Sequence, residues 1–320
     1  MSIYMKILLN YLQLITPISA FKLNWSSEVL ALFEFQSNTD YIQPQIYSVQ
    51  CLLQKYSSQQ STYFETLFIT ALIPFVLIIL LIIFWMILKL VKSSFPTFWD
   101  DFISTCIILL FLLHSSIVKK MFASMNCTEI NNGEYWLEED LDIKCWNYEH
   151  YFYVMTISLP TIIIWGIILP TVCLIALIRD KENLKSINIR VRYGFIFNGY
   201  KESKFYWEFI ILYSKIVLIC CSIFYQRISL KLQAVSATIL YTIYFRLQYS
   251  NNPYSENDLN RTELRSKFAC LFTIYCGLFY LMGSLNEGVS YFLFSLIALI
   301  NLYFLCFMCF CIAKTIFNKK

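Results

Sequence analysis

The sequence is poor in charge. Aspartate, glutamate, lysine and arginine make up only 14% of its 320 residues, whereas globular proteins carry roughly a quarter. Hydrophobic residues make up 58%, and they form long blocks such as the one from Thr66 to Val91. A helix needs about 20 such residues to cross a bilayer. The composition therefore argues against a soluble fold and for membrane spans.

Other absences narrow the function. No acidic residue is expected at mid-span, which argues against a proton-coupled carrier built on membrane carboxylates. No span carries arginine at every third position, and no TVGYG filter occurs, so a voltage sensor and a potassium pore of these kinds are not expected. The histidines are His114 and His150, and no hydrolase or metalloprotease signature accompanies them. We therefore do not expect the protein to be an enzyme. We also expect no catalytic residue, metal site, cofactor or nucleic-acid partner.

Eight apolar segments predict an all-α, polytopic membrane helix bundle. Seven are strong, and the first is short and interrupted by Asn10, Gln13 and Pro17. The segments are Ile7–Phe21, Thr66–Val91, Phe102–Phe122, Tyr151–Ile178, Trp207–Tyr225, Ser229–Leu247, Lys267–Ser284 and Val289–Lys314. We expect one multi-pass domain over residues 1–320, with an outer segment at 22–65 and seven spans in 66–320.

Lysine and arginine set the expected orientation, because they accumulate on the cytoplasmic side. Alternate connecting segments hold most of them, above all residues 179–204. Both termini are then cytoplasmic if the first span is retained. We expect the protein in the plasma membrane or an endomembrane. Residues 1–21 also resemble a signal peptide, with Lys6 before an apolar core and a small residue at Ala20. Asn10 and Gln13 favour a retained helix.

The loop between the third and fourth segments is then outside, where disulfides persist. It reads "CTEINNGEYWLEEDLDIKC", and Cys127 and Cys145 at its ends predict one disulfide. Asn126 and Asn260 begin glycosylation-type triplets, and only Asn126 is expected on the lumenal side. The acidic residues between the cysteines indicate a solvated cap, or alternatively a cation-attracting vestibule or a calcium site. The state and partner of Cys51 stay open.

The fourth segment contains three residues that weaken a regular helix: Pro160, Gly166 and Pro170. Each proline removes a backbone donor and frees a carbonyl. Such breaks are tolerated in membranes where neighbouring groups or water satisfy the backbone. A gating hinge and a static kink are both consistent with this pattern.

A knot of aromatic residues and glycines precedes the fifth segment. It contains Tyr193, Gly194, Gly199, Tyr200 and Trp207, and the glycines permit turns that other residues would strain. We expect a turn-rich inner segment docked under the bundle.

Two charges follow this turn. Glu208 stands in the first turn of the fifth helix, where a carboxylate meets the positive helix end and is expected to mark the water boundary. Lys215 lies seven residues on, on the same face and about 10 Å deeper. It either snorkels to the cytoplasm or pairs inside the bundle. We favour a structural role for both residues over a pore lining.

Several stretches together resemble a known family. "KILLNYLQ", "HSSIVKKMF", "YWLEEDLDIKCW", "RVRYGFIFNGY…FYWEFIILYSK" and "NPYSENDLN" occur in this order. They resemble the C-terminal multi-pass region of large protist surface proteins with cysteine-rich, growth-factor-receptor-like repeats, a region loosely similar to fungal transient-receptor-potential-like channels. The cysteine-rich repeats themselves are absent from this sequence.

The resemblance implies a topology more than an activity. We expect a cation-permeable channel or channel-like protein, on the helix count, the kinked fourth segment, the acidic cap and the similarity to fungal channels. The alternative is a non-conducting receptor or anchor that belongs to a larger surface protein. The bilayer is the expected partner, and self-association or other membrane subunits are open.

Overall fold

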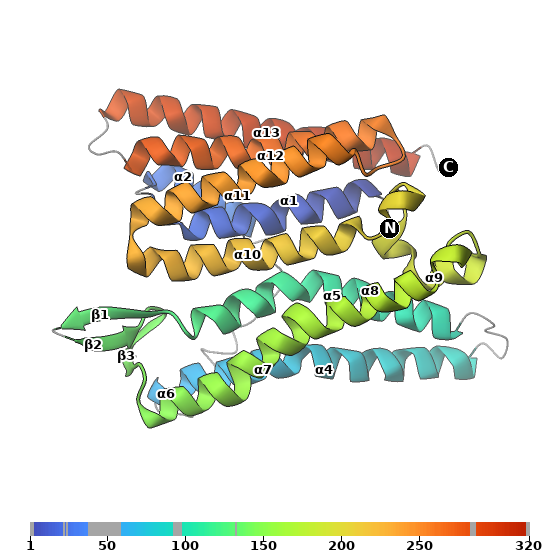
Figure 1. Cartoon of the computed structure of the whole chain (residues 1–320), viewed down its shortest axis with the longest axis horizontal. Helices are drawn as coiled ribbons and strands as arrows, with labels where there is room; N and C mark the ends of the chain where they lie inside the picture. Colours follow the sequence, from blue (N-terminus) through green and yellow to red (C-terminus); the bar gives the residue numbers. More distant parts are fainter. Residues whose placement is uncertain are drawn as a thin grey trace. The chain divides into compact units, whose positions relative to one another are not determined.

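The structure is a computed structural model, and it describes residues 3–21, 23, 25–37, 59–91, 98–131, 133–281 and 286–317. Cys51 lies outside the described residues. Every apolar segment predicted from the sequence contains helix. The long helices are α1 (Ile3–Ala20), α4 (Gln59–Val91), α5 (Phe98–Ala123), α10 (Trp207–Ile228), α11 (Leu230–Asn251), α12 (Asn257–Leu281) and α13 (Glu287–Phe317) (Figure 1).

The fourth segment is a composite helix. It comprises α6 (Tyr148–Tyr153), α7 (Leu159–Thr161) and α8 (Leu169–Arg179), and the links between them, Val154–Ser158 and Ile162–Ile168, are π-helical. A regular α-helical hydrogen-bond ladder is thus broken twice, and Pro160 and Pro170 each fall at the start of an α-helical piece after a π-helical one. Their missing donors are least costly there, because π-bulges and helix starts already depart from the regular ladder.

The described chain contains six helical stretches long and apolar enough to cross a membrane. They are Thr62–Val91, Phe98–Ala123, Tyr148–Arg179, Glu202–Tyr225, Asn257–Leu281 and Glu287–Phe317. The prediction of seven strong spans is corrected here, because α11 is not among the six. Its apolar residues are interspersed with polar ones such as Gln233 and Gln248, and these two are buried inside the protein. The weak first segment is a shorter apolar helix, as expected.

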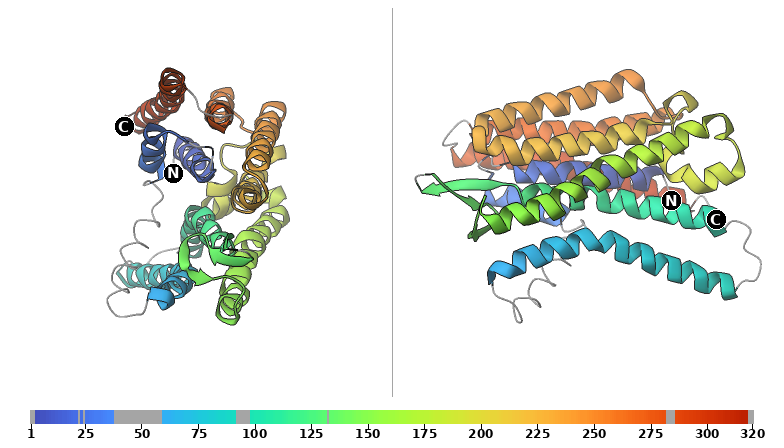
Figure 2. Two further views of the ribbon diagram at one scale, coloured as in Figure 1. Left: turned by 90° about the vertical axis from the view of Figure 1, so that its left-hand side faces the viewer. Right: turned by 60° about the horizontal axis from the view of Figure 1, so that its bottom comes forward.

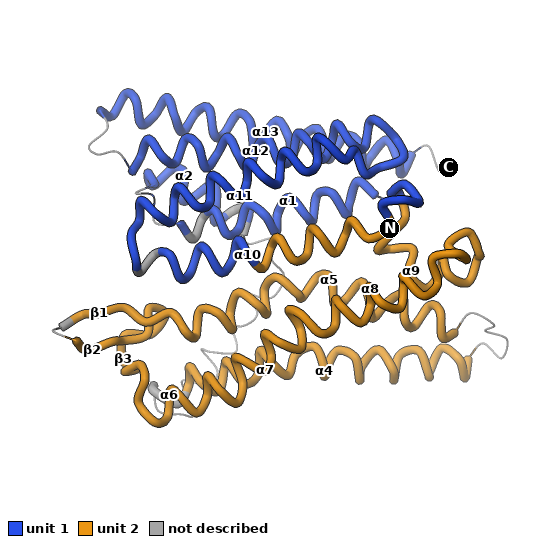
Figure 3. The backbone as a smooth tube through the Cα atoms, viewed as in Figure 1, with its two compact units in different colours: residues 1–40, 199–204, 217–320 blue, residues 41–198, 205–216 orange. Residues whose placement is uncertain are grey.

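The chain forms two compact units (Figure 3). Unit 1 consists of residues 1–40, 199–204 and 217–320, and unit 2 of residues 41–198 and 205–216. Helix α10 contributes its first half to unit 2 and its second half to unit 1. The expectation of one multi-pass domain stays a prediction.

Unit 2 combines α4, α5, the composite helix and α9 (Ile187–Phe197) with a small sheet that the sequence analysis did not predict. Strands β1 (Cys127–Asn131), β2 (Glu134–Leu137) and β3 (Asp140–Lys144) form an antiparallel sheet in chain order. Helix α9 packs against α5. The Arg192 guanidinium on α9 contacts the Asp100 carboxylate at 2.6 Å, and this bond raises the pKa of Arg192 above its ordinary value.

Unit 1 is a helical bundle. Helix α12 packs against α1, α11 and α13, and the short helix α2 (Ser27–Ser37) packs against α1 and α13 (Figure 2). Gly277 on α12 allows a close approach, because a Cβ there would lie 2.5 Å from the Trp25 ring. Tyr11 of α1 meets Phe304 of α13, with ring centroids 4.6 Å apart. These contacts place the N-terminal and C-terminal helices in one core.

The inner aromatic segment is only partly a turn. Tyr193 and Gly194 lie inside α9, so the predicted turn at Gly194 is wrong. Gly199 has a φ of +94°, and a Cβ there would come within 2.8 Å of Ile3. Both features require glycine. Gly199 and Tyr200 belong to unit 1, whereas Tyr193 and Trp207 belong to unit 2, so the sequence motif divides between the units.

Candidate functional site

The strongest local construction is the disulfide cap, which we define as residues 124–150 of unit 2. Its hairpin strands bring the two ends of the loop together, and Cys127 and Cys145 form a disulfide across 18 residues with a Cα–Cα distance of 6.2 Å. The predicted disulfide is therefore confirmed. Both cysteines are buried. A crosslink of this loop length stabilises the fold by about 3 kcal/mol in the chain-entropy description.

The cap has an apolar face that continues into the helical core of unit 2. Leu137 of β2 and Ile143 of β3 are buried in one cluster with the disulfide, Phe64 of α4 and Trp165 of the composite helix. Phe64 also stacks on Tyr153, with ring centroids 4.2 Å apart. In β3, Ile143 points inward while Leu141 and Asp142 are exposed. The sheet therefore packs directly on the helices of unit 2.

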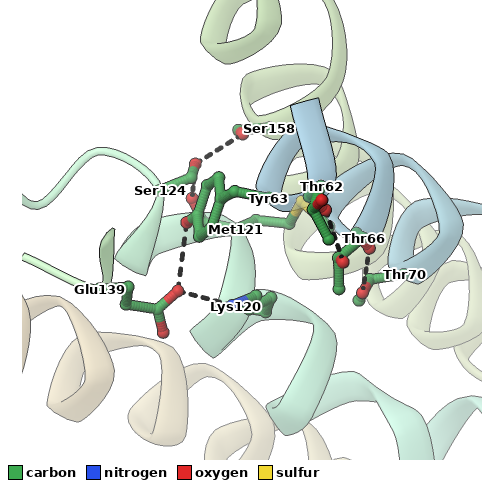
Figure 4. A network of polar contacts seen from close by, with 9 residues as sticks. All are labelled: Thr62, Tyr63, Thr66, Thr70, Lys120, Met121, Ser124, Glu139 and Ser158. Atoms are coloured by element: carbon green, nitrogen blue, oxygen red, sulfur yellow. Dashed lines mark hydrogen bonds and ion pairs between the residues drawn. The ribbon is translucent and has the colours of Figure 1, made fainter. Parts of the chain in front are cut away.

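Polar contacts also attach the cap to the helices of unit 2 (Figure 4). The Lys120 Nζ at the end of α5 lies 2.6 Å from the Glu139 Oε2 in the β2–β3 turn. The Tyr63 hydroxyl of α4 donates to the same carboxylate oxygen at 3.1 Å. The Lys120 Nζ also lies 4.9 Å from the Tyr63 ring centroid. One carboxylate of the cap therefore binds two helices of the bundle.

A second set of contacts joins the start of the composite helix to the end of α5. The Ser124 hydroxyl donates to the Met121 carbonyl, so the Ser158 hydroxyl supplies the proton in their 2.6 Å hydrogen bond. His150 accepts from the Trp146 amide at Nδ1 and contacts the Ser124 carbonyl from Nε2 at 3.0 Å. These partners assign the proton of the neutral ring to Nε2. Asn147 caps the helix by accepting from the His150 amide.

The cap's acidic residues are partly neutralised within the cap. Glu134 pairs with Lys144 at 2.6 Å, and the Glu129 carboxylate accepts from the Gly133 amide. With Glu139 bound to Lys120 and the Asp140 carboxylate accepting from the Asp142 amide, four of the carboxylates have identified partners. This arrangement supports the solvated, structural cap over a cation-attracting vestibule.

The cap also brings three potential metal ligands together. Ligand atoms of Cys127, Cys145 and His150 all lie within 4.8 Å of one another. A cysteine binds a metal as the thiolate, and here both sulfurs are joined to each other. The disulfide accounts for this cluster in the described structure.

The two glycosylation-type asparagines are buried in the folded chain. Asn126 is 7% exposed and Asn260 is 3% exposed. The Asn260 amide donates to the Tyr254 carbonyl and accepts from the Tyr254 amide, each at 2.9 Å. Glycosylation of Asn126 and its sidedness stay predictions, and the low exposure counts against a glycan there.

The predicted charges of α10 are buried. Lys215 has no exposed surface, and its Nζ lies 4.8 Å from the centroid of the Phe111 ring on α5. Glu208 is 1% exposed in the first turn of α10, so protein neighbours cover it, and its position at the water boundary stays a prediction. His114, also on α5 and fully buried, lies within electrostatic reach of Lys215. Burial favours the predicted pairing of Lys215 inside the bundle over snorkelling.

Sequence reasoning missed a buried polar network in unit 1. Glu263 is unexposed, and its carboxylate lies 3.2 Å from the Lys267 Nζ one turn further along α12. Lys267 also donates to the Gln248 amide oxygen of α11 at 2.9 Å. The Tyr254 hydroxyl lies 3.4 Å from the other Glu263 oxygen. The spacing of four residues between Glu263 and Lys267 is the signal that could have revealed this pair.

A second network in unit 1 centres on Asn301 of α13. Its amide donates to the Thr273 hydroxyl at 2.9 Å and to the Ile297 carbonyl at 2.8 Å. Its amide oxygen accepts from the Tyr11 hydroxyl, and Tyr11 in turn accepts from Gln36 at 3.2 Å. Four helices of unit 1 thus converge on one polar centre.

Comparisons with known proteins give a distant relation. No protein-family model matches the chain, and no solved structure matches it. The chain is similar to the Cysteine repeat modular protein A of Toxoplasma gondii, with 27% identity over 132 residues. The match covers 39% of this chain and 4% of that protein. It supports a relation to cysteine-rich protist surface proteins over that part alone, and no comparison supports the resemblance to fungal transient-receptor-potential-like channels.

Proposed function

We propose that this chain is a non-conducting, multi-pass membrane anchor whose disulfide cap braces its extracellular face. The proposal rests on the contacts that attach the cap to the helices of unit 2. One carboxylate, Glu139, binds Lys120 and Tyr63 on two different helices, and the apolar side of the sheet shares a core with those helices. A crosslinked sheet built in this way transmits load from outside into the bundle.

The relation to a cysteine-repeat protein is consistent with this role. The aligned region is a small fraction of that protein's length, so a membrane-embedded portion of a large modular protein is a natural counterpart. In this proposal the cap faces the extracellular or lumenal side, because the disulfide persists in an oxidising compartment. The six apolar helices supply the membrane attachment.

Reconstitution tests the proposal directly. The purified full chain in liposomes should pass tracer cations no faster than protein-free liposomes, with gramicidin as the positive control. In cells, the chain should resist extraction at alkaline pH. Removal of the disulfide by Cys127→Ser/Cys145→Ser should lower its surface abundance. Cation flux above the protein-free background would overturn the anchor.

A cation-permeable channel is the second candidate, and unit 2 supplies the observation in its favour. Lys215 and His114 are buried ionisable groups within apolar helices, and such residues often mark ion or proton paths. The composite helix of the same unit contains two π-helical stretches, which occur frequently at functional sites.

Matched variants separate the two candidates in the same liposomes. Lys215→Met removes the buried charge. Lys181→Met removes an exposed charge of the same unit just beyond the end of the span Tyr148–Arg179. A channel that uses Lys215 should show flux that changes in the first variant and not in the second. Equal flux in the unmodified chain and in both variants would reject Lys215 as part of the ion path.

A further inference from the structure

Unit 1 contains a cavity that none of the roles above uses. It has a volume of about 540 Å³ and lies where the first two turns of α12 meet the last turns of α13, with Tyr4 of α1 beside them. This size falls within the range of roughly 300–1,000 Å³ that is typical of small-molecule sites. We call it the basic pocket, after its charged lining residues: Arg261, Arg265, Lys314 and Asp258.

The charge of the pocket is strongly positive. Three cationic side chains line it against one carboxylate. Arg261 and Arg265 are one turn apart, so they share a face of α12. The Asp258 carboxylate lies 3.7 Å from Arg261, but both side chains are more than two-thirds exposed. A pair of this kind is weak, so Arg261 remains able to bind an incoming anion.

The position of the cations is supported by packing. The Arg265 guanidinium lies 4.6 Å from the centroid of the Phe307 ring on α13. Stacking on an aromatic face restrains the planar group and leaves its edge donors free to bind a ligand. Lys314 stands in the last turn of α13, one turn beyond Phe310. The pocket is therefore lined by pre-positioned donors from two helices.

The pocket also has an apolar wall that faces outward. Phe310 is 65% exposed, and α13 is one of the helices long and apolar enough to span the membrane. A ligand that meets the charges and this wall together is amphiphilic. On the orientation expected from the sequence, the pocket lies at the cytoplasmic surface. Basic pockets between spans on that side are suited to anionic lipid headgroups.

We propose that the basic pocket binds a phosphate-bearing headgroup, and that its source is an anionic membrane lipid. Arg261 and Arg265 contact the phosphate oxygens with their planar donor forks, and Lys314 adds a third charge. The acyl region lies along Phe310. This site is independent of whether the chain conducts ions, because all of its residues belong to unit 1.

Binding of lipid in nanodiscs tests the site with charge-matched variants. The purified full chain is reconstituted into phosphatidylcholine nanodiscs, and fluorescent phosphatidylinositol phosphate is titrated into them. The pocket variant is Arg261→Gln/Arg265→Gln/Lys314→Gln. The control is Lys201→Gln/Lys231→Gln/Arg246→Gln, which removes three exposed cations of the same unit outside the pocket. Each basic side chain near an anionic surface contributes roughly fivefold, so the pocket variant should bind roughly 100-fold more weakly.

Lipid binding by the control variant should weaken by less than about 10-fold. Equal losses in the two triple variants would show attraction by net charge alone and overturn the pocket. No loss in the pocket variant would overturn it as well. Melting temperatures of all three proteins, measured without lipid, should agree, since the substituted side chains are exposed.

A competition arm identifies the source of the phosphate. Soluble inositol trisphosphate at a large excess should displace the lipid only weakly, because it lacks the acyl chains that meet Phe310. Full displacement at concentrations equal to the lipid's would assign the pocket to a free phosphorylated solute and overturn the lipid. Replacement of Phe310 by Gln should weaken lipid binding and leave inositol trisphosphate binding unchanged.

Discussion

The two units stabilise buried polarity in different ways. Unit 2 has a covalent crosslink, a sheet with an apolar face and a partly exposed ion pair at the junction of cap and helices. Unit 1 has free cysteines in its described part, and it holds its helices together with unexposed polar groups such as Glu263, Lys267 and Asn301. The disulfide makes the cap of unit 2 sensitive to redox conditions, and the buried network makes unit 1 sensitive to the loss of single partners.

This difference follows from where each polar group lies. A surface ion pair exchanges hydration for a modest attraction, typically worth 0–1 kcal/mol. A buried group without its partner loses its hydration without compensation, at a cost of several kcal/mol. Variants that change one unit alone test this difference. Amide hydrogen exchange reports the stability of each unit separately.

The largest effect is expected at Glu263. Glu263→Ala leaves the buried Lys267 charge without its carboxylate, so the free energy of unfolding should fall by about 3–5 kcal/mol. Unfolding in mixed detergent micelles measures the loss, and hydrogen exchange should rise in α11 and α12 while β1–β3 stay protected.

The double variant Glu263→Gln/Lys267→Met is the control. It removes both charges and keeps their approximate volume, so it should be nearly neutral. A double variant as unstable as Glu263→Ala would show that the loss comes from packing and not from an isolated charge.

The next effect is expected at the disulfide. Cys127→Ser/Cys145→Ser should cost about 3 kcal/mol and raise hydrogen exchange in the cap alone. Cys306→Ser/Cys309→Ser, at two exposed free cysteines, should leave stability nearly unchanged. Mass mapping of non-reduced protein should recover the Cys127 and Cys145 peptides joined. Free thiols at both positions would contradict the structure of the cap.

A smaller loss is expected at Asn301. Asn301→Leu leaves Tyr11 and Thr273 without this shared partner, and a buried polar group left unsatisfied costs about 1–3 kcal/mol. Ser295→Ala on the exposed side of the same helix should change stability by less than about 0.5 kcal/mol. Equal losses in the two variants would remove the special role of this network in unit 1.

The smallest effect is expected at Glu139. Its ion pair with Lys120 is partly exposed, so Glu139→Gln should cost at most about 1 kcal/mol. The difference should shrink in 1 M salt, because salt screens exposed charges. Glu134→Gln removes a more exposed pair and should cost less still. A Glu139 loss as large as that of Glu263→Ala would erase the distinction between the units.

Part of the candidate site was readable from the sequence. Cys127 and Cys145 bracket an acidic loop, and their disulfide was predicted from position alone. The sheet between them was missed, although residues 140–144, DLDIK, alternate polar and apolar side chains as a strand does. Gly194 was assigned to a turn because glycine permits one, but the surrounding residues form a helix. Glycine permits a turn without requiring it.

The sequence by itself determined the helical class, the positions of the apolar segments and the loop that the disulfide closes, because these depend on local composition and on short spacings. Only the tertiary structure decided which polar side chains are buried and with what. Tyr11 and Asn301 lie 290 residues apart and share a hydrogen bond, and Glu208 is buried by protein neighbours although it stands in the first turn of its helix. Burial is set by neighbours that are distant in the sequence, and hydrophobic periodicity within one helix does not record them.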